Sequence, residues 1–272
     1  MRRIAAALLL ALALAGLHAA VAAADEPRGW HPKLGDARSY AGTRKGDVAF
    51  AVRTRDRHWS HRGAVQYRSA SVVKAMLLVA YLRHADVRER RLRGDERALL
   101  EPMIRRSDNR AADAVHARVG LPALTALGRR AGMLHFLAHP VWGGSLITAD
   151  DQARFFRRID RLVPARHREY ATGLLRGVVA GQRWGMPAAL PEGWTIAFKG
   201  GWGPGVTRQV THQAALLTRG RERVAVAVLT ADNPSTPYGA ETIRGVTQRL
   251  LRGLEGRLTG VVTFKRAKVI PA

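Results

Sequence analysis

Hydrophobic and polar residues follow two different periods along this chain. Alternation with a period of two, typical of half-buried strands, marks residues 47–52 and three late segments, 194–200, 209–219 and 223–231. Apolar residues at helical spacing fill the middle, over 71–82, 94–106, 109–120, 121–132, 151–163 and 167–179, and an amphipathic helix is predicted over 239–254. The segment 71–82 is apolar on nearly every side, which predicts a buried helix.

This order of elements predicts an α/β fold. The first strand is expected to join the last three in one antiparallel sheet, flanked by helices, with an all-helical lobe inserted between them. We expect a single domain over residues 45–272, with a sheet lobe at about 45–68 and 191–257 and a helical lobe at about 69–190. Residues 25–44 are polar and contain proline and glycine, so we expect a loose leader there.

The first 24 residues have the pattern of a secretory signal peptide. Arg2 and Arg3 precede an apolar stretch, and Ala22 to Ala24 form a small-residue cleavage site before Asp25. A retained membrane anchor is the alternative, although the stretch is short for a span. The chain is therefore expected to be secreted or associated with the cell wall, and it has no cysteine for disulfides or thiolate sites.

The chain carries a formal net charge of +24. One interpretation is electrostatic association with an anionic cell wall, and the other is the arginine-rich composition of a GC-rich genome. Export argues against a nucleic-acid partner, and we expect a monomer. No cofactor or metal site is predicted, because the ten histidines show no HExxH-type spacing.

Lys74 is unusual because the chain uses 39 arginines and only 6 lysines, and because this lysine interrupts the buried helix. Ser71 lies three residues earlier, on the same helical face. A buried lysine with a depressed pKa can take the proton of a serine hydroxyl, which arginine cannot do. Ser71 and Lys74 are therefore a candidate nucleophile and base; a lysine that extends its ammonium to solvent is the alternative.

Two further motifs carry candidate chemistry. Ser107, Asp108 and Asn109 stand at a helix start, where Ser107 could transfer a proton to a leaving group and Asn109 could donate to a substrate amide. Simple helix capping explains the same triplet. Lys199, Gly200 and Gly201 end a predicted strand, and the glycines would let another backbone approach closely, or mark an ordinary exit into a turn.

The three motifs in this order resemble those of the penicillin-recognising serine hydrolases, the β-lactamases and penicillin-binding D,D-peptidases. The resemblance covers about residues 45–255 and is nearest to the class A β-lactamases. It implies that Ser71 is the nucleophile, Lys74 the acylation base and Ser107 the proton shuttle. It also implies that Asn109 contacts the substrate amide and that Lys199 binds the substrate carboxylate. Gly200 and Gly201 would lie along the backbone of the substrate.

Departures from the family pattern leave the reaction open. Lys-Gly-Gly lacks the middle hydroxyl that helps hold a substrate carboxylate, and no glutamate occurs between Glu101 and Glu169 to activate the deacylating water. His139 is a candidate replacement base. We expect β-lactamase-like hydrolysis of a β-lactam or a D-Ala-D-Ala-like peptidoglycan peptide. The alternatives are D,D-carboxypeptidase-like activity with slow deacylation, and a largely non-catalytic binding protein.

Overall fold

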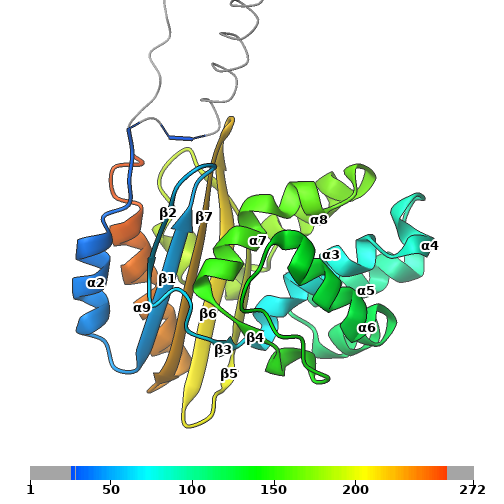
Figure 1. Cartoon of the computed structure of the whole chain (residues 1–272), viewed down its shortest axis with the longest axis horizontal. Coiled ribbons are helices and arrows are strands. Elements are labelled where there is room, and N and C mark those ends of the chain that lie inside the picture. Colours follow the sequence, from blue (N-terminus) through cyan, green and yellow to red (C-terminus); the bar gives the residue numbers. More distant parts are fainter. Residues whose placement is uncertain (1–25, 28, 256–272) are drawn as a thin grey trace, which may run out of the picture.

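The computed structural model describes residues 26–27 and 29–255 (Figure 1). The predicted signal peptide, residues 1–24, lies outside the described residues. None of the helices within the described part of the chain is long and apolar enough to cross a membrane.

A five-stranded antiparallel sheet forms the centre of the fold, in the order β2-β1-β7-β6-β5. Its strands are β1 (Asp47–Arg53), β2 (His58–His61), β5 (Thr195–Pro204), β6 (Gln209–Arg219) and β7 (Glu222–Asn233). The last three form the predicted meander, and β1 joins them along β7 with Phe50 opposite Val228. The predicted α/β fold, with strands from both ends of the chain in one sheet, is confirmed.

Helices cover both faces of the sheet (Figure 1). One face carries α2 (Leu34–Gly42) and α9 (Thr236–Leu250). On the other face, α7 (Ala149–Leu162) packs on β7, β1 and β6, and α8 (Arg168–Arg176) packs on β5. Beyond them lie α3 (Lys74–Leu82), α4 (Ala85–Arg88), α5 (Gly94–Arg105) and α6 (Asn109–Ala131). Every residue of α3 is buried, as its all-round apolar pattern predicts.

Glycine and polar caps set the helix boundaries in the inserted lobe. Gly120 has a φ of 71°, a left-handed conformation that glycine tolerates, and it kinks α6 where the sequence predicts one helix to end. Gly132 ends the second half in the left-handed helical conformation, with a φ of 72° and a ψ of 28°. Thr148 caps α7 by accepting a hydrogen bond from the Asp151 N–H at 3.2 Å.

Residues 34–42 correct the prediction of a loose leader over 25–44. They form α2, which packs against α9 and buries Ala37 and Ala41. Its partner helix has a glycine at 245, where a Cβ would lie 2.3 Å from the Tyr40 ring. The short helix shows little amphipathic pattern because its buried residues are mostly alanines, so sequence periodicity missed it.

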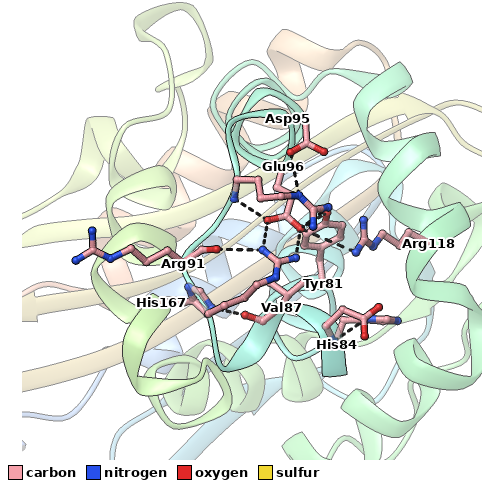
Figure 2. A network of polar contacts seen from close by, with 11 residues as sticks. Tyr81, His84, Val87, Arg91, Asp95, Glu96, Arg118 and His167 are labelled. Carbon is pink, nitrogen blue, oxygen red and sulfur yellow. Dashed lines mark hydrogen bonds and ion pairs between the residues drawn. The ribbon is translucent and has the colours of Figure 1, made fainter.

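Glu96 anchors the start of α5 (Figure 2). Its buried carboxylate accepts hydrogen bonds from two Arg90 nitrogens, at 2.7 and 2.8 Å, and from the Arg93 backbone N–H at 2.8 Å. The Arg90 hydrogen bonds, opposed by burial, lower the pKa of Glu96 to about 2. Arg118 of α6 adds a longer ion pair at 3.9 Å, so one carboxylate ties α5 to α6, the helices on either side of Ser107 and Asp108.

Candidate active site

Ser71 lies on a short 3-10 helix, Ala70–Val73, that runs directly into the buried helix α3. The residue before it, Ala70, has a φ of 43°, in the left-handed region that a residue with a side chain rarely adopts. Ser71 is half-buried and lines a cleft of about 320 Å³. Strained backbone beside a partly exposed serine at a helix start is an arrangement suited to a nucleophile.

Lys74 is fully buried beneath this cleft. Its Nζ donates to the Ser107 carbonyl oxygen at 2.5 Å and to Asn109 Oδ1 at 2.8 Å, and it lies 3.4 Å from Ser107 Oγ. Burial lowers the pKa of Lys74 to about 8, against the opposing effect of nearby carboxylates. A lysine with this pKa is partly neutral near physiological pH and can accept a proton.

The expected hydrogen bond between Lys74 and Ser71 is not among the contacts of the described residues. A neutral lysine has two N–H bonds and one lone pair. The Ser107 carbonyl and Asn109 Oδ1 accept the two N–H bonds, which leaves the lone pair free for a proton. These contacts hold Lys74 in a position suited to a base and also fix Asn109, which lines the cleft and whose NH₂ group is left to donate.

Ser107 brings the two motif lysines together. Lys199 is also buried, and its Nζ donates to Ser107 Oγ at 3.1 Å and to the Gly200 carbonyl oxygen at 2.7 Å. Burial and, secondarily, the charge of Lys74 hold the pKa of Lys199 well below its usual value. One hydroxyl therefore contacts both lysines, although 33 and 92 residues separate them from it. This connection gives a route for a proton across the site.

The glycines of the third motif allow β5 to lie against the nucleophile. A Cβ at Gly201 would lie 2.7 Å from the backbone nitrogens of Ser71 and Val72, so no other residue fits there without displacing the strand. At Gly200 a Cβ would meet only the Trp184 ring and Gln213, at 3.5 Å or more. Gly201 is therefore required for close approach, whereas Gly200 is not.

His212 and Gln213 have structural contacts. The His212 Nδ1 accepts from the Thr230 N–H at 3.1 Å, so Nε2 carries the proton and donates to the Arg68 carbonyl oxygen at 3.0 Å. Burial lowers the pKa of His212 to about 4 and keeps it neutral. Gln213 binds the Met186 N–H and the Trp184 carbonyl oxygen, which places the Trp184 ring in edge contact with Trp202 at 5.6 Å. Of the two aromatic residues, Trp202 lines the cleft itself.

The loop from residue 137 to 146 covers the other side of Ser71. His139 lines the cleft, and its Nδ1 lies 3.0 Å from both the backbone nitrogen and the carbonyl oxygen of Val141. Trp142 places its ring 4.6 Å from Lys74 Nζ, and its Nε1 donates to Asp113 Oδ1 at 2.7 Å. An indole therefore lies beside the candidate base, and the Val141 backbone holds the Nδ1 of the candidate replacement base.

All seven candidate residues gather at this site: Ser71, Lys74, Ser107, Asn109, Lys199, Gly200 and Gly201. Sequence reasoning did not single out Trp142. A signal was present, because Trp142 lies between Glu101 and Glu169, the stretch in which the resemblance implies a glutamate and the sequence has none. Among the described residues, no group of three or more histidine, aspartate or glutamate side chains could hold a metal.

Comparisons with known proteins identify the family and the fold. The model of the beta-lactamase enzyme family matches residues 95–254. A beta-lactamase structure from Sphaerobacter thermophilus has 20% identity and a TM-score of 0.69, covering 81% of this chain and 96% of its own. A structure of PBP-A has 20% identity and a TM-score of 0.70, with coverages of 82% and 95%.

A class A beta-lactamase from Mycobacterium abscessus is similar as well, at 20% identity and a TM-score of 0.66, over 82% of this chain and 99% of that one. No curated protein sequence matches the chain significantly. At such identities the structural likeness establishes the fold and leaves the reaction to be argued from the site.

Proposed function

The chain belongs to the beta-lactamase family of serine hydrolases, and we propose from this premise that Ser71 is its acylated nucleophile. The substrate would be a β-lactam or a D-Ala-D-Ala-like peptidoglycan peptide. The observation that carries the proposal is the contact of Ser107 Oγ with both buried lysines, at 3.4 Å from Lys74 and 3.1 Å from Lys199. A purely structural role does not explain why two buried lysines contact the same hydroxyl, that of Ser107, below the cleft that Ser71 lines.

In the acylation step, neutral Lys74 removes the Ser71 hydroxyl proton as the oxygen attacks the carbonyl carbon of the scissile amide. The new C–O bond forms, the C–N bond breaks, and the leaving nitrogen needs one proton. Ser107 supplies it and is reprotonated by the lysine that accepted the first proton. The contacts of Lys74 and Lys199 with Ser107 support this route.

Substrate binding would use Asn109 and Lys199. The Asn109 NH₂ group can donate to the amide on the acyl side, because its carbonyl oxygen already accepts from Lys74. Lys199, through Ser107, would meet a carboxylate on the leaving-group side. The Lys-Gly-Gly motif offers no hydroxyl at Gly200 to help, so we expect weaker carboxylate binding than a Lys-Thr-Gly motif would give.

Deacylation is expected to be slow. The family's glutamate has no counterpart in the loop, the Trp142 indole lies beside Lys74, and the Val141 backbone holds the ring of His139 through Nδ1. These contacts favour a peptidase-like enzyme with a long-lived acyl-enzyme over a fast β-lactamase. The same observations support the second candidate, a protein that captures such ligands with little turnover.

Export would bring the protein to these substrates. The leader pattern of residues 1–24 predicts secretion, and the charge of +24 would favour a position near an anionic wall. Both remain proposals that fractionation of cells expressing the full chain would test.

The first test is the intact mass of the protein after brief exposure to a penicillin. We expect an adduct on the wild type and none on Ser71→Ala or Lys74→Arg. Ser39→Ala, an exposed serine on α2, is the matched control and should behave as the wild type.

The lifetime of the adduct separates the candidates. Decay with release of hydrolysed drug identifies an enzyme, and an adduct that persists without product identifies a capture protein. An adduct on Ser71→Ala, or none on the wild type with either a penicillin or a D-Ala-D-Ala peptide ester, would contradict the proposal.

A further inference from the structure

The cleft beside Ser71 has largely apolar walls and one permanently charged side chain. Its apolar lining side chains are those of Ala70, Val141, Trp142, Trp202, Pro204 and Val210. Among the described residues, no aspartate or glutamate lines the cleft, and Arg68 supplies its permanent charge. A volume of about 320 Å³ is large enough for an aromatic ring or a short side chain. The cleft therefore suits an apolar group that meets a single cation.

Arg68 has no partner among the described residues. Its side chain is exposed, and it takes part in no hydrogen bond or ion pair with them. Asp113 does not line the cleft, and its Oδ1 already accepts from Trp142 Nε1 at 2.7 Å. A guanidinium presents five N–H donors in a planar fork that matches the two oxygens of a carboxylate. The fork of Arg68 must therefore find its acceptors in a ligand or in the solvent.

The backbone of Arg68 is fixed close to the nucleophile. Arg68 belongs to β3 (Tyr67–Arg68), which pairs with β4 (Leu146–Ile147) and ends three residues before Ser71. Its carbonyl oxygen accepts a hydrogen bond from the buried His212 Nε2 at 3.0 Å. These contacts fix the point on the cleft wall from which the Arg68 side chain extends.

The cleft lies on the acyl side of the bond that the proposed function would break. Asn109, which would contact the acyl-side amide, lines the cleft, whereas Ser107 and Lys199, which would meet the leaving group, do not. Lys199 is buried, and its Nζ donates to Ser107 Oγ and to the Gly200 carbonyl oxygen. The exposed cation of the site is therefore Arg68, on the acyl side.

We propose that Arg68 is a specificity-determining residue that binds a carboxylate on the acyl-side substituent of the substrate. This proposal rests on the proposed function. It narrows the substrate class to acyl groups that are apolar where they meet the cleft walls and anionic where they reach Arg68. Arg68 takes no part in proton transfer and acts through binding. Because its guanidinium is exposed, water screens the ion pair and its effect is modest.

The test compares two penicillins that differ by one carboxylate, benzylpenicillin and carboxybenzylpenicillin. The second-order rate constant for acylation of Ser71 is measured by intact mass with each compound, at low ionic strength, where exposed charges are screened least. The ratio of the two constants, carboxybenzyl over benzyl, is then compared between variants, so the intrinsic reactivities of the compounds cancel. Arg68→Gln should lower this ratio about fivefold, the effect of one exposed ion pair. Arg68→Lys, which keeps the charge without the fork, should retain part of the preference.

The matched control is Arg208→Gln, at an exposed position between β5 and β6 that does not line the cleft. It removes the same charge from the chain, so it should keep the wild-type ratio if Arg68 acts by direct contact. A ratio that Arg68→Gln does not lower would overturn the proposal. So would an equal decrease in both variants, because the diffuse positive charge of the protein would then explain the preference.

Binding to Ser71→Ala separates a failure of this proposal from a failure of the proposed function. If the wild type forms no adduct with either penicillin, the proposed function fails. The role of Arg68 is then decided by equilibrium binding of both compounds to Ser71→Ala, followed by the fluorescence of Trp142 and Trp202, which line the cleft. Binding of the carboxybenzyl compound that Arg68→Gln weakens selectively in this background supports the carboxylate contact. Equal weakening of both compounds, or no binding of either, refutes it.

Discussion

If Lys74 is the base that deprotonates Ser71, the rate of acylation must follow the neutral fraction of Lys74. Burial places its pKa at about 8, below the ordinary 10.5. About one molecule in ten then has neutral Lys74 near pH 7, and about nine in ten near pH 9. The second-order rate constant of acylation should therefore rise about tenfold over this range and level off above it.

The assay is single-turnover acylation by a fluorescent penicillin, followed as labelled protein over time at each pH. Two variants test whether Lys74 causes the pH dependence of the acylation rate. Lys74→Arg keeps the charge but cannot lose its proton, so acylation should fall by roughly a hundredfold or more. Lys45→Arg, at an exposed position outside the site, should leave both the rate and the profile unchanged.

Asp113→Asn gives the sharpest assignment, because the Asp113 carboxylate raises the pKa of Lys74. Removing that charge should move the midpoint of the profile to lower pH, and asparagine can still accept the hydrogen bond from Trp142. A profile that is flat between pH 7 and 9, or a midpoint that Asp113→Asn does not move, would refute the assignment of Lys74 as the base.

Three other changes test the remaining steps. Trp142→Ala should shorten the acyl-enzyme lifetime several-fold in a chase experiment, because it admits water beside the base, while Trp142→Phe should not. Gly201→Ala should slow acylation on the order of a hundredfold, because its Cβ would push β5 away from Ser71. Gly143→Ala should leave the rate of acylation unchanged, because a Cβ at that position would lie 3.9 Å from its nearest neighbour. Glu96→Gln should lower the free energy of unfolding, measured in urea, by about 3 kcal/mol. This figure follows because the pKa of Glu96 falls from 4.5 to about 2, and each pKa unit corresponds to about 1.36 kcal/mol. In the wild type this stability is present above pH 4.5 and is lost as the pH falls toward 2.

The sequence was sufficient to predict most of the fold because its strands and helices have strong periodic patterns. The meander and the buried helix α3 were predicted closely, and the spacing of Ser71 and Lys74 identified the candidate chemistry. Helix α2 was missed because two buried alanines give little hydrophobic contrast. The pattern of hydrophobic and polar residues predicts the burial of a segment only when the residues on its buried side are clearly more hydrophobic than those on its exposed side.

The partners of the site residues could not be predicted from spacing. Sequence reasoning paired Lys74 with Ser71 from their positions on one helix, but the hydrogen bonds of Lys74 go to Ser107 and Asn109, 33 and 35 residues away. The Trp142 ring reaches Lys74 from a loop still further along the chain. Such contacts depend on how the lobes pack, and one sequence carries no direct signal of that packing.

The electrostatics of the two lysines explains why the site uses lysine twice in an arginine-rich chain. Both are buried and both contact Ser107 Oγ, so a proton on Lys74 disfavours a proton on Lys199. The reverse must hold by the same amount, because the coupling between two protonation equilibria is reciprocal. The pair therefore tends to hold one proton rather than two, and Ser107 lies between the two positions. Two arginines would keep both charges at every relevant pH, so only lysines suit the proposed mechanism, in which the site takes a proton from Ser71 and returns it to a leaving group.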